Sequence, residues 1–182
     1  MMQVNQTTIT VVRGSVLEQD VEAIVNAANT AMRGGGGVDG AIHRAAGPGL
    51  LRELERVAPN GAPTGTAVLT HGHNLKQPWI IHTPGPVWRG GNHGEAELLA
   101  SSYRSCLEIA NAQRLASIAF CSISTGVYGY PLVQAAPLAL RTVRDWLLAH
   151  PDTSLVCVRF AMFQEQEYQE FTRALQVLAQ AD

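Results

Sequence analysis

Glycine is concentrated in one short segment of this sequence. Seven of its 17 glycines fall between Gly34 and Gly49, and Gly34 to Gly37 are consecutive. Glycine lets the backbone approach a ligand closely and adopt positive φ, so that consecutive N–H groups can converge on an anion. A helical pattern over 38–46 follows directly, and its N-terminus adds the positive end of a helix dipole. The segment is therefore a candidate phosphate-binding loop.

A second loop of the same kind runs from Ser122 to Pro131, between a predicted buried strand and a predicted helix. No Lys or Arg occurs in residues 115–140, so a diphosphate bound here would be held by backbone amides. One glycine-rich loop alone is more typical of a tight turn. Two such loops at the ends of neighbouring strands favour a diphosphate-binding site.

Three polar residues flank the glycines. Asn26 and Asn29 end a predicted strand, and their side-chain amides offer both donors and acceptors to sugar hydroxyls. Asp39 opens the helix that follows. A lone aspartate there is typical of a residue favoured by the helix dipole, but directly behind an anion site it is a candidate for orienting or deprotonating a water. His43, four residues on, is placed either to hydrogen-bond Asp39 or to pack in the core.

A dinucleotide site is a weaker interpretation of the same glycines. Gly35, Gly37 and Gly40 satisfy G-x-G-x-x-G, the fingerprint of dinucleotide-binding folds. The motif follows the second predicted strand instead of the first, and no strand ending in an acidic residue comes about 20 positions later. A dinucleotide-dependent oxidoreductase is therefore disfavoured.

A metal site is not predicted. His71 and His73 share a strand face, but no third ligand converges with them by spacing. The chain has three cysteines, which are far apart and form no C-x-x-C pair. This usage favours reduced thiols and a cytoplasmic location.

Composition narrows the class of protein. Of the 182 residues, 46% are hydrophobic and 15% charged, which predicts one folded domain over 1–182 and excludes a disordered chain. A net charge of −2 lacks the basic footprint of proteins that bind nucleic acid or anionic membranes. No apolar run approaches the roughly 18 residues of a membrane span. Lys76 is the sole lysine, so Schiff-base chemistry and a phosphate-loop lysine are excluded unless Lys76 provides them.

The elements that must position these residues alternate between strands and helices. Strands are predicted over Thr8–Val12, Ala23–Ala28, Thr66–Thr70, Trp79–Thr83, Ser117–Ser122 and Ser154–Phe160. Helices are predicted over Val38–Ala46, Gly49–Val57, Glu95–Asn111, Ala136–His150 and Glu165–Ala179. This alternation predicts an α/β sandwich with a mostly parallel sheet. Too few residues separate the third and fourth strands for a crossover helix, so the sheet should be mixed.

Four segments together resemble the macrodomain family: Val25–Asn29, Gly34–Pro48, Ile80–Pro86 and Ile123–Pro131. More narrowly, they are similar to the MacroD type and its bacterial O-acetyl-ADP-ribose deacetylases, over a stretch from Thr8 to Trp146. The resemblance implies a three-layer α/β/α sandwich around a mixed sheet of about six strands, which binds ADP-ribose at the strand ends. No cofactor or metal is implied, because the ligands of the zinc-bearing subclass do not occur and Lys76 matches no catalytic-lysine position.

The resemblance also assigns roles to residues. Asn29 and Asp39 would serve the distal ribose and the attacking water, and Tyr128 would close over that ribose. Residues 35–38 would line one side of the diphosphate and residues 124–128 the other. The ligand-binding residues expected from the motifs are Ser15, Val16, Asn26, Gly35, Gly36, Gly37, Val38, Ser124, Thr125, Gly126, Val127 and Tyr128.

The stretch after the first strand departs from the family. The family has Gly-Asp-Ile-Thr, whose Asp accepts from the adenine amino group, and this chain has Gly14-Ser15-Val16-Leu17. Replacing a charge-assisted hydrogen bond by one to a neutral hydroxyl could cost about 1–2 kcal/mol of adenine recognition. Glu18 and Asp20 are the candidates to compensate.

The implied activity is hydrolysis of ADP-ribose esters. The expected partners are ADP-ribose, O-acetyl-ADP-ribose and proteins that carry mono-ADP-ribose on Asp or Glu, with a water positioned by Asp39 and a substrate phosphate. Attack at the anomeric carbon and attack at the acyl carbonyl both remain open. The alternative is a non-catalytic reader module, which binds ADP-ribose without hydrolysing it. Such a module does not need both Asp39 and Asn29, so their presence favours the enzyme. The oligomeric state and a regulatory protein partner, such as a ribonuclease, are also left open.

Overall fold

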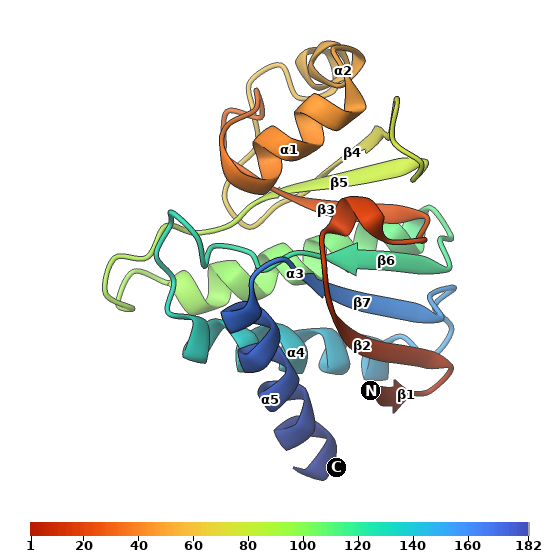
Figure 1. Ribbon diagram of the computed structural model, residues 1–182, viewed down its shortest axis with the longest axis vertical. Coiled ribbons are helices and arrows are strands. Elements are labelled where there is room, and N and C mark those ends of the chain that lie inside the picture. Colours follow the sequence, from red (N-terminus) through yellow and green to blue (C-terminus); the bar gives the residue numbers. More distant parts are fainter. Residues whose placement is uncertain (182) are drawn as a thin grey trace.

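Short apolar segments form one seven-stranded sheet (Figure 1). The structure, a computed structural model, describes residues 1–181. The strands lie in the order β1-β2-β7-β6-β3-β5-β4. Their bounds are Met2–Val4 for β1, Thr7–Arg13 for β2, Ala23–Ala28 for β3, Val68–His71 for β4, Trp79–Pro84 for β5, Ser117–Phe120 for β6 and Cys157–Met162 for β7.

The sheet is mixed, as the sequence predicted. The central strands β2, β7, β6, β3 and β5 are parallel, whereas β1 and β4 run antiparallel at the two edges. The short connection between β4 and β5 permits only the antiparallel pairing. The sheet has one strand more than the expected six or so, because the three residues of β1 are too few to give an alternating pattern.

Five α-helices flank the sheet: α1 Gly37–Ala46, α2 Gly49–Val57, α3 Glu95–Ala112, α4 Leu132–Ala149 and α5 Glu165–Ala181. A short 3₁₀ turn, η1, spans Val16–Glu18. The helices α1 and α2 gather at the β4 end of the sheet and α4 and α5 at the β1 end (Figure 1). Within residues 1–181, no helix has the length and apolarity needed to cross a membrane.

Aromatic packing joins the sheet to the helices and to one loop of the site. Phe120 on β6 stacks on Phe160 of β7 with ring centroids 5.3 Å apart, and Phe160 meets Phe171 of α5 at 5.5 Å. Burying each ring stabilises the fold by roughly 2 kcal/mol. Tyr103 on α3 packs against the same cluster, and its hydroxyl accepts the N–H of Ile123 at 3.3 Å. The core therefore anchors the loop that follows β6.

The five parallel strands end at the same edge of the sheet. Ligands of open α/β sheets bind at the carboxyl ends of the strands, where the connecting loops leave a crevice. Here the relevant loops follow β2, β3, β5, β6 and β7. They bring together segments that lie far apart in the sequence.

Candidate functional site

A cavity of about 630 Å³ opens at the carboxyl ends of the parallel strands. Every one of the five parallel strands contributes to its wall, either from its last residues or from the loop that follows. The residues that line it are Ser15, Val16, Ala27, Ala28, Asn29, Gly35, Gly36, Gly37, Val38, Asp39, Ala41, Arg44, Gly85, Cys121, Ser122, Ser124, Gly126, Val127, Tyr128, Ala161, Phe163, Gln164 and Glu167. The two loops singled out from the sequence thus face one another across a single cavity.

The glycine loop is shaped by close contacts that a side chain would disturb. A Cβ on Gly40 would lie 2.7 Å from the carbonyl oxygen of Gly35, so α1 approaches the loop only because Gly40 lacks one. Gly37 adopts φ +59°, a left-handed conformation that favours glycine. A Cβ on Gly36 or Gly37 would meet nothing within 4 Å. The loop therefore leaves the N-terminus of α1 open toward the cavity, where it favours an anion.

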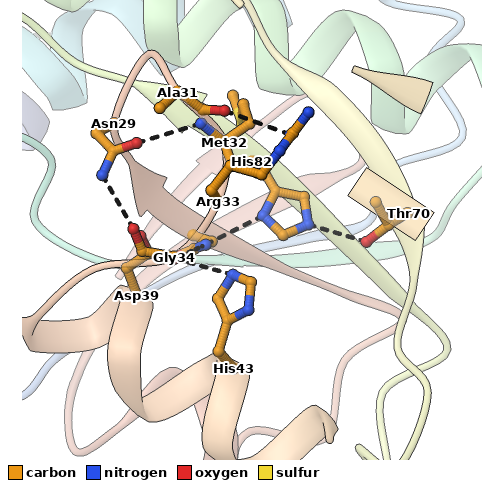
Figure 2. Close-up of polar contacts among 10 residues, drawn as sticks. Asn29, Ala31, Met32, Arg33, Gly34, Asp39, His43, Thr70 and His82 are labelled. Atoms are coloured by element: carbon orange, nitrogen blue, oxygen red, sulfur yellow. Dashed lines mark hydrogen bonds and ion pairs between the residues drawn. The ribbon is translucent and has the colours of Figure 1, made fainter. Parts of the chain in front are cut away.

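The side chain of Asn29 holds the start of the same loop (Figure 2). Its Nδ2 donates to the carbonyl oxygen of Gly34 at 3.1 Å, and its Oδ1 accepts the N–H of Met32 at 3.2 Å. The amide keeps one further N–H and one further lone pair. Asn29 can thus shape the loop and still offer polar atoms to a ligand in the cavity that it lines.

Asp39 is a buried carboxylate in the first turn of α1, with 4% of its surface exposed. Its Oδ1 accepts a hydrogen bond from Asn26 Nδ2 at 2.8 Å and lies 3.4 Å from His43 Nε2. Burial raises the pKa of Asp39 above its usual value of 3.8, although Asn26 and His43 both act to lower it. Within the described residues Oδ2 accepts no hydrogen bond, which leaves this oxygen to bind a water or a ligand.

Asn26 does not reach the cavity, although we expected it to contact a sugar. It is fully buried behind Asp39 and does not belong to the cavity wall. Its Nδ2 donates to Asp39 Oδ1 and lies 3.0 Å from His82 Nδ1. Asn26 lies inside β3, where the carboxylate of Asp39 covers its amide, whereas Asn29 follows the last residue of the strand and lines the cavity.

The loop after β6 presents a strained residue to the cavity. Ser124 has φ +69° and is 6% exposed, and its buried Oγ has no hydrogen-bond partner in residues 1–181. A Cβ on Gly85 would come within 2.3 Å of that hydroxyl oxygen, so the two loops interlock through Gly85. Val127 is completely exposed, and the carbonyl oxygen of Tyr128 accepts the N–H of Trp88 at 2.8 Å. The loop is therefore tied to the segment that follows β5.

Thr125 is the second expected ligand-binding residue that lies outside the cavity wall. Its Oγ1 is 2.5 Å from Ser122 Oγ, so the hydroxyl is engaged within its own loop. The side chain thus helps to set the shape of the loop, while its neighbours Ser124 and Gly126 line the cavity.

Comparison with known proteins identifies the family of this chain. The Macro domain family matches residues 25–139, more than half of the chain. This chain is a macrodomain. It is 47% identical over 172 residues to a macro domain-containing protein of Caldanaerobacter subterraneus subsp. tengcongensis, covering 93% of this chain and 97% of that relative. It is 50% identical over 169 residues to a protein named O-acetyl-ADP-ribose deacetylase of Salmonella gallinarum, covering 91% and 92% of the two chains.

The same fold is found in a solved structure of a glycine-to-valine mutant of the Oceanobacillus iheyensis macrodomain with ADPR. The two structures superpose with a TM-score of 0.90 at 40% sequence identity. The match covers 98% of this chain and 97% of that one.

The segment after β2 of the macrodomain is organised by a capping box. Ser15 Oγ accepts the N–H of Leu17 at 3.1 Å, and Glu18 Oε1 accepts the N–H of Ser15 at 2.9 Å. Asp20 pairs with Lys76 at 3.1 Å on the surface. Neither Glu18 nor Asp20 lines the cavity, so the two acidic residues that we considered as substitutes for the family aspartate are engaged elsewhere.

Several residues of the macrodomain cavity were not identified from the sequence. Phe163 follows β7 directly, is 71% exposed and lines the cavity together with Gln164 and Glu167. An exposed aromatic ring at the mouth of a cavity offers a stacking surface for a planar group. The sequence feature that could have identified Phe163 is its position shortly after a predicted buried strand. Cys121 also lines the cavity, but burial raises the pKa of its thiol to about 12, so the thiol stays neutral.

A second polar cluster lies on the surface near β4. Glu53 on α2 is 8% exposed, and its carboxylate oxygens lie 3.0 Å from His71 Nδ1 and 2.8 Å from His73 Nε2. Glu53 is therefore a third potential ligand beside the two histidines, which the spacing of residues in the sequence did not reveal. Even so, the described residues contain no group of three or more His, Cys, Asp or Glu side chains arranged to hold a metal ion.

Proposed function

We propose that this macrodomain binds ADP-ribose and hydrolyses its esters, both O-acetyl-ADP-ribose and ADP-ribose attached to Asp or Glu side chains of proteins. The observation that carries the proposal is the position of Asp39: a buried carboxylate with one free oxygen, directly beside an anion-binding glycine loop and on the wall of the same cavity. The names of two similar proteins, an O-acetyl-ADP-ribose deacetylase and a macrodomain with ADPR, support it.

The cavity offers a separate environment to each part of ADP-ribose. The diphosphate fits between the N-terminus of α1 and the loop 124–128, where backbone N–H groups supply the donors and Arg44 is the basic side chain of the wall. The adenine fits at the end formed by Ser15, Val16 and Phe163. The distal ribose then falls beside Asn29, Asp39 and Tyr128.

Hydrolysis requires a positioned water and a group that accepts a proton from it. When the ester is at the anomeric carbon, the leaving group is a carboxylate, which needs little protonation because it is a stable anion. When the acyl carbonyl of O-acetyl-ADP-ribose is attacked, the leaving group is a ribose oxygen, which must receive a proton as it departs. Asp39 Oδ2 would accept a hydrogen bond from the water and take up one proton as the water oxygen forms its new bond to carbon and the ester C–O bond breaks. In attack at the anomeric carbon that proton then passes to solvent, whereas in acyl attack Asp39 gives it to the departing ribose oxygen. The N-terminus of α1 stabilises the negative charge on the neighbouring phosphate throughout.

The point of attack is open to a direct test. Attack on the acyl carbonyl of O-acetyl-ADP-ribose in ¹⁸O-labelled water places the label in acetate. Attack on a sugar carbon leaves the acetate unlabelled. For O-acetyl-ADP-ribose we propose acyl attack, and for esters at the anomeric carbon we propose attack on the sugar through an oxocarbenium-like transition state.

The decisive experiment compares wild type with Asp39→Asn, which keeps the shape of the side chain and removes its charge. O-acetyl-ADP-ribose hydrolysis is followed by mass spectrometry and ADP-ribose binding by calorimetry. We expect the variant to lose at least about a hundredfold in kcat, the usual order for a general base, while it still binds ADP-ribose. Wild-type protein that binds ADP-ribose without forming product would instead be a reader. An Asp39→Asn variant with wild-type activity would show that the Asp39 carboxylate does not take part in the reaction.

A further inference from the structure

A chain of buried polar groups leads from Asp39 away from the cavity (Figure 2). Asn26 on β3 donates to Asp39 and contacts His82 on β5, whose Nε2 lies 2.9 Å from Thr70 Oγ1 on β4. The Thr70 hydroxyl in turn donates to the carbonyl oxygen of His71 at 3.2 Å. Asn26 and His82 are 0% exposed and Thr70 is 1% exposed. The chain therefore crosses three adjacent strands entirely within the protein.

Only one arrangement of protons satisfies every contact in this chain. Thr70 has a single hydroxyl proton, which it gives to the His71 carbonyl oxygen, so its oxygen must accept from His82. His82 therefore carries its proton on Nε2 and has a lone pair on Nδ1. Burial lowers the pKa of His82 to about 3, so the ring is neutral at physiological pH. The Nδ1 lone pair then accepts a hydrogen bond from Asn26 Nδ2.

This tautomer fixes the orientation of the Asn26 amide. Nδ2 has two protons, of which one points to His82 Nδ1 and the other to Asp39 Oδ1. A rotated amide would direct its oxygen toward both a carboxylate and a lone pair, and both contacts would be repulsive. Within the described residues the amide oxygen has no hydrogen-bond partner, so nothing on that side holds the group in place. The orientation depends on the partners of the nitrogen.

We propose that Thr70 and His82 are positioning residues for ester hydrolysis, which act by fixing the Asn26 amide so that it always donates to Asp39. This inference rests on the proposed function. The hydrogen bond from Asn26 occupies Oδ1 and stops the carboxylate from rotating, which directs Oδ2 to the attacking water. Thr70 and His82 do not belong to the cavity wall, so their effect falls on kcat and not on substrate binding.

The same chain influences the protonation of Asp39. Donation from Asn26 opposes the rise in the pKa of Asp39 that burial causes. When the amide is free to rotate, that opposition weakens and the pKa of Asp39 rises further. The acid limb of the pH profile then moves to higher pH. Other ionisable groups also surround Asp39. They are His43 and Arg44 on α1, the neutral ring of His82, the neutral thiol of Cys121, and Glu167 on α5.

Substitutions of Thr70 separate the hydroxyl from the rest of the side chain. Thr70→Val keeps the shape and removes the hydroxyl, whereas Thr70→Ser keeps the hydroxyl and removes a methyl group. A matched control is Thr7→Val, because Thr7 is also 1% exposed and its hydroxyl donates to the Leu155 carbonyl oxygen at 2.6 Å outside the chain. Each variant is measured for O-acetyl-ADP-ribose turnover from about pH 4 to 8, for ADP-ribose affinity and for thermal stability.

We expect Thr70→Val to lose about tenfold in kcat, the order seen when a group that orients a reactive ligand loses its own partner. Its KM and ADP-ribose affinity should stay at wild-type values, and its acid limb should move to higher pH. Thr70→Ser should be active like wild type, and Thr7→Val should lose stability without losing kcat. Wild-type kinetics for Thr70→Val, or an equal loss for Thr7→Val, overturns the inference alone. Wild-type protein without turnover overturns the proposed function together with it.

The protonation of His82 is tested separately in the wild-type protein. Nitrogen-15 NMR of the histidine ring distinguishes the Nε2–H tautomer from the Nδ1–H tautomer and from imidazolium. We expect a neutral Nε2–H ring that does not titrate from about pH 5 to 8. An Nδ1–H ring, or a ring that titrates in this range, overturns the inference even when the Thr70 variants fail to fold.

Discussion

Replacing Gly40 with alanine tests how the glycine loop is held against α1. A Cβ on Gly40 would lie 2.7 Å from the carbonyl oxygen of Gly35, whereas ordinary van der Waals contact begins at 3.4 Å. Gly40 lies within α1, where alanine is favoured over glycine by about 1 kcal/mol. The substitution therefore leaves the helix itself intact and changes its distance from the loop.

The size of the effect follows from these two separations. The loop and the helix must move apart by about 0.7 Å, which a close-packed structure resists. Overpacking costs about 1–3 kcal/mol, so after the gain in helix propensity the free energy of unfolding falls by about 0–2 kcal/mol. A diphosphate bound to the displaced N–H groups loses the equivalent of one hydrogen bond to a charged group, about 1.5–3 kcal/mol. ADP-ribose affinity should therefore fall by roughly tenfold to a hundredfold.

Calorimetry with ADP-ribose and thermal unfolding measure the two effects separately. Gly94→Ala serves as the control, because Gly94 has φ +77° at the N-cap of α3 and a Cβ there would meet nothing within 4 Å. Its backbone strain should lower stability by about 1 kcal/mol without changing affinity. If Gly40→Ala binds ADP-ribose like wild type, the close approach of Gly35 and α1 does not orient the loop. An equal loss of affinity in Gly94→Ala would trace the effect to stability.

Three further predictions concern stacking, pH and the core. Phe163→Ala should weaken ADP-ribose binding by about 1–3 kcal/mol, measured by calorimetry, with little change in melting temperature because the ring is 71% exposed; unchanged affinity would exclude stacking. Burial acts to raise the pKa of Glu53, but hydrogen bonds, led by the one from His71, outweigh it and hold the pKa below 4.5. The ionised Glu53 therefore stabilises the fold above pH 4.5, and this contribution disappears as the pH falls through the folded-state pKa. The difference in melting temperature between wild type and Glu53→Gln should accordingly shrink on acidification, and a difference that grows would contradict the sign. Tyr103→Phe should lower the free energy of unfolding by about 1 kcal/mol, in a denaturant titration, because the N–H of Ile123 loses its acceptor; no loss would mean that this hydrogen bond adds nothing.

Much of the fold could be predicted from the sequence because local patterns determine it. The apolar run Ala23–Ala28 is a central strand with the predicted bounds, and the stretch Gly49–Val57 is a helix with the predicted bounds. The strand β1 was missed because it consists of three residues and is stabilised only by its pairing with β2. β1 is a strand because it pairs with β2, and the pattern of its own residues does not indicate one.

The candidate site could be predicted only where it is continuous in the sequence. The glycine loop and Asp39 are adjacent along the chain, so their types and spacing revealed them. Asn26 was expected to contact the ligand because the sequence does not show that the side chain of Asp39 covers its amide. Thr70 and His82 could not be found at all, because they meet Asn26 only through the pairing of β4 with β5 and of β5 with β3.

The order of the strands has a consequence for how the protein is made. β2 pairs with β7, with Thr8 opposite Cys157. This edge of β2 therefore has no partner until a strand about 150 residues later in the chain has been made. During synthesis the residues up to the end of β7 must leave the ribosome before this seam can close, and until then the edge of β2 stays open to other chains. Ser15 and Phe163, the two sides of the proposed adenine pocket, lie on opposite sides of that seam. A nucleotide that contacts both would join two loops whose synthesis is separated by that of all the strands and helices between β2 and β7.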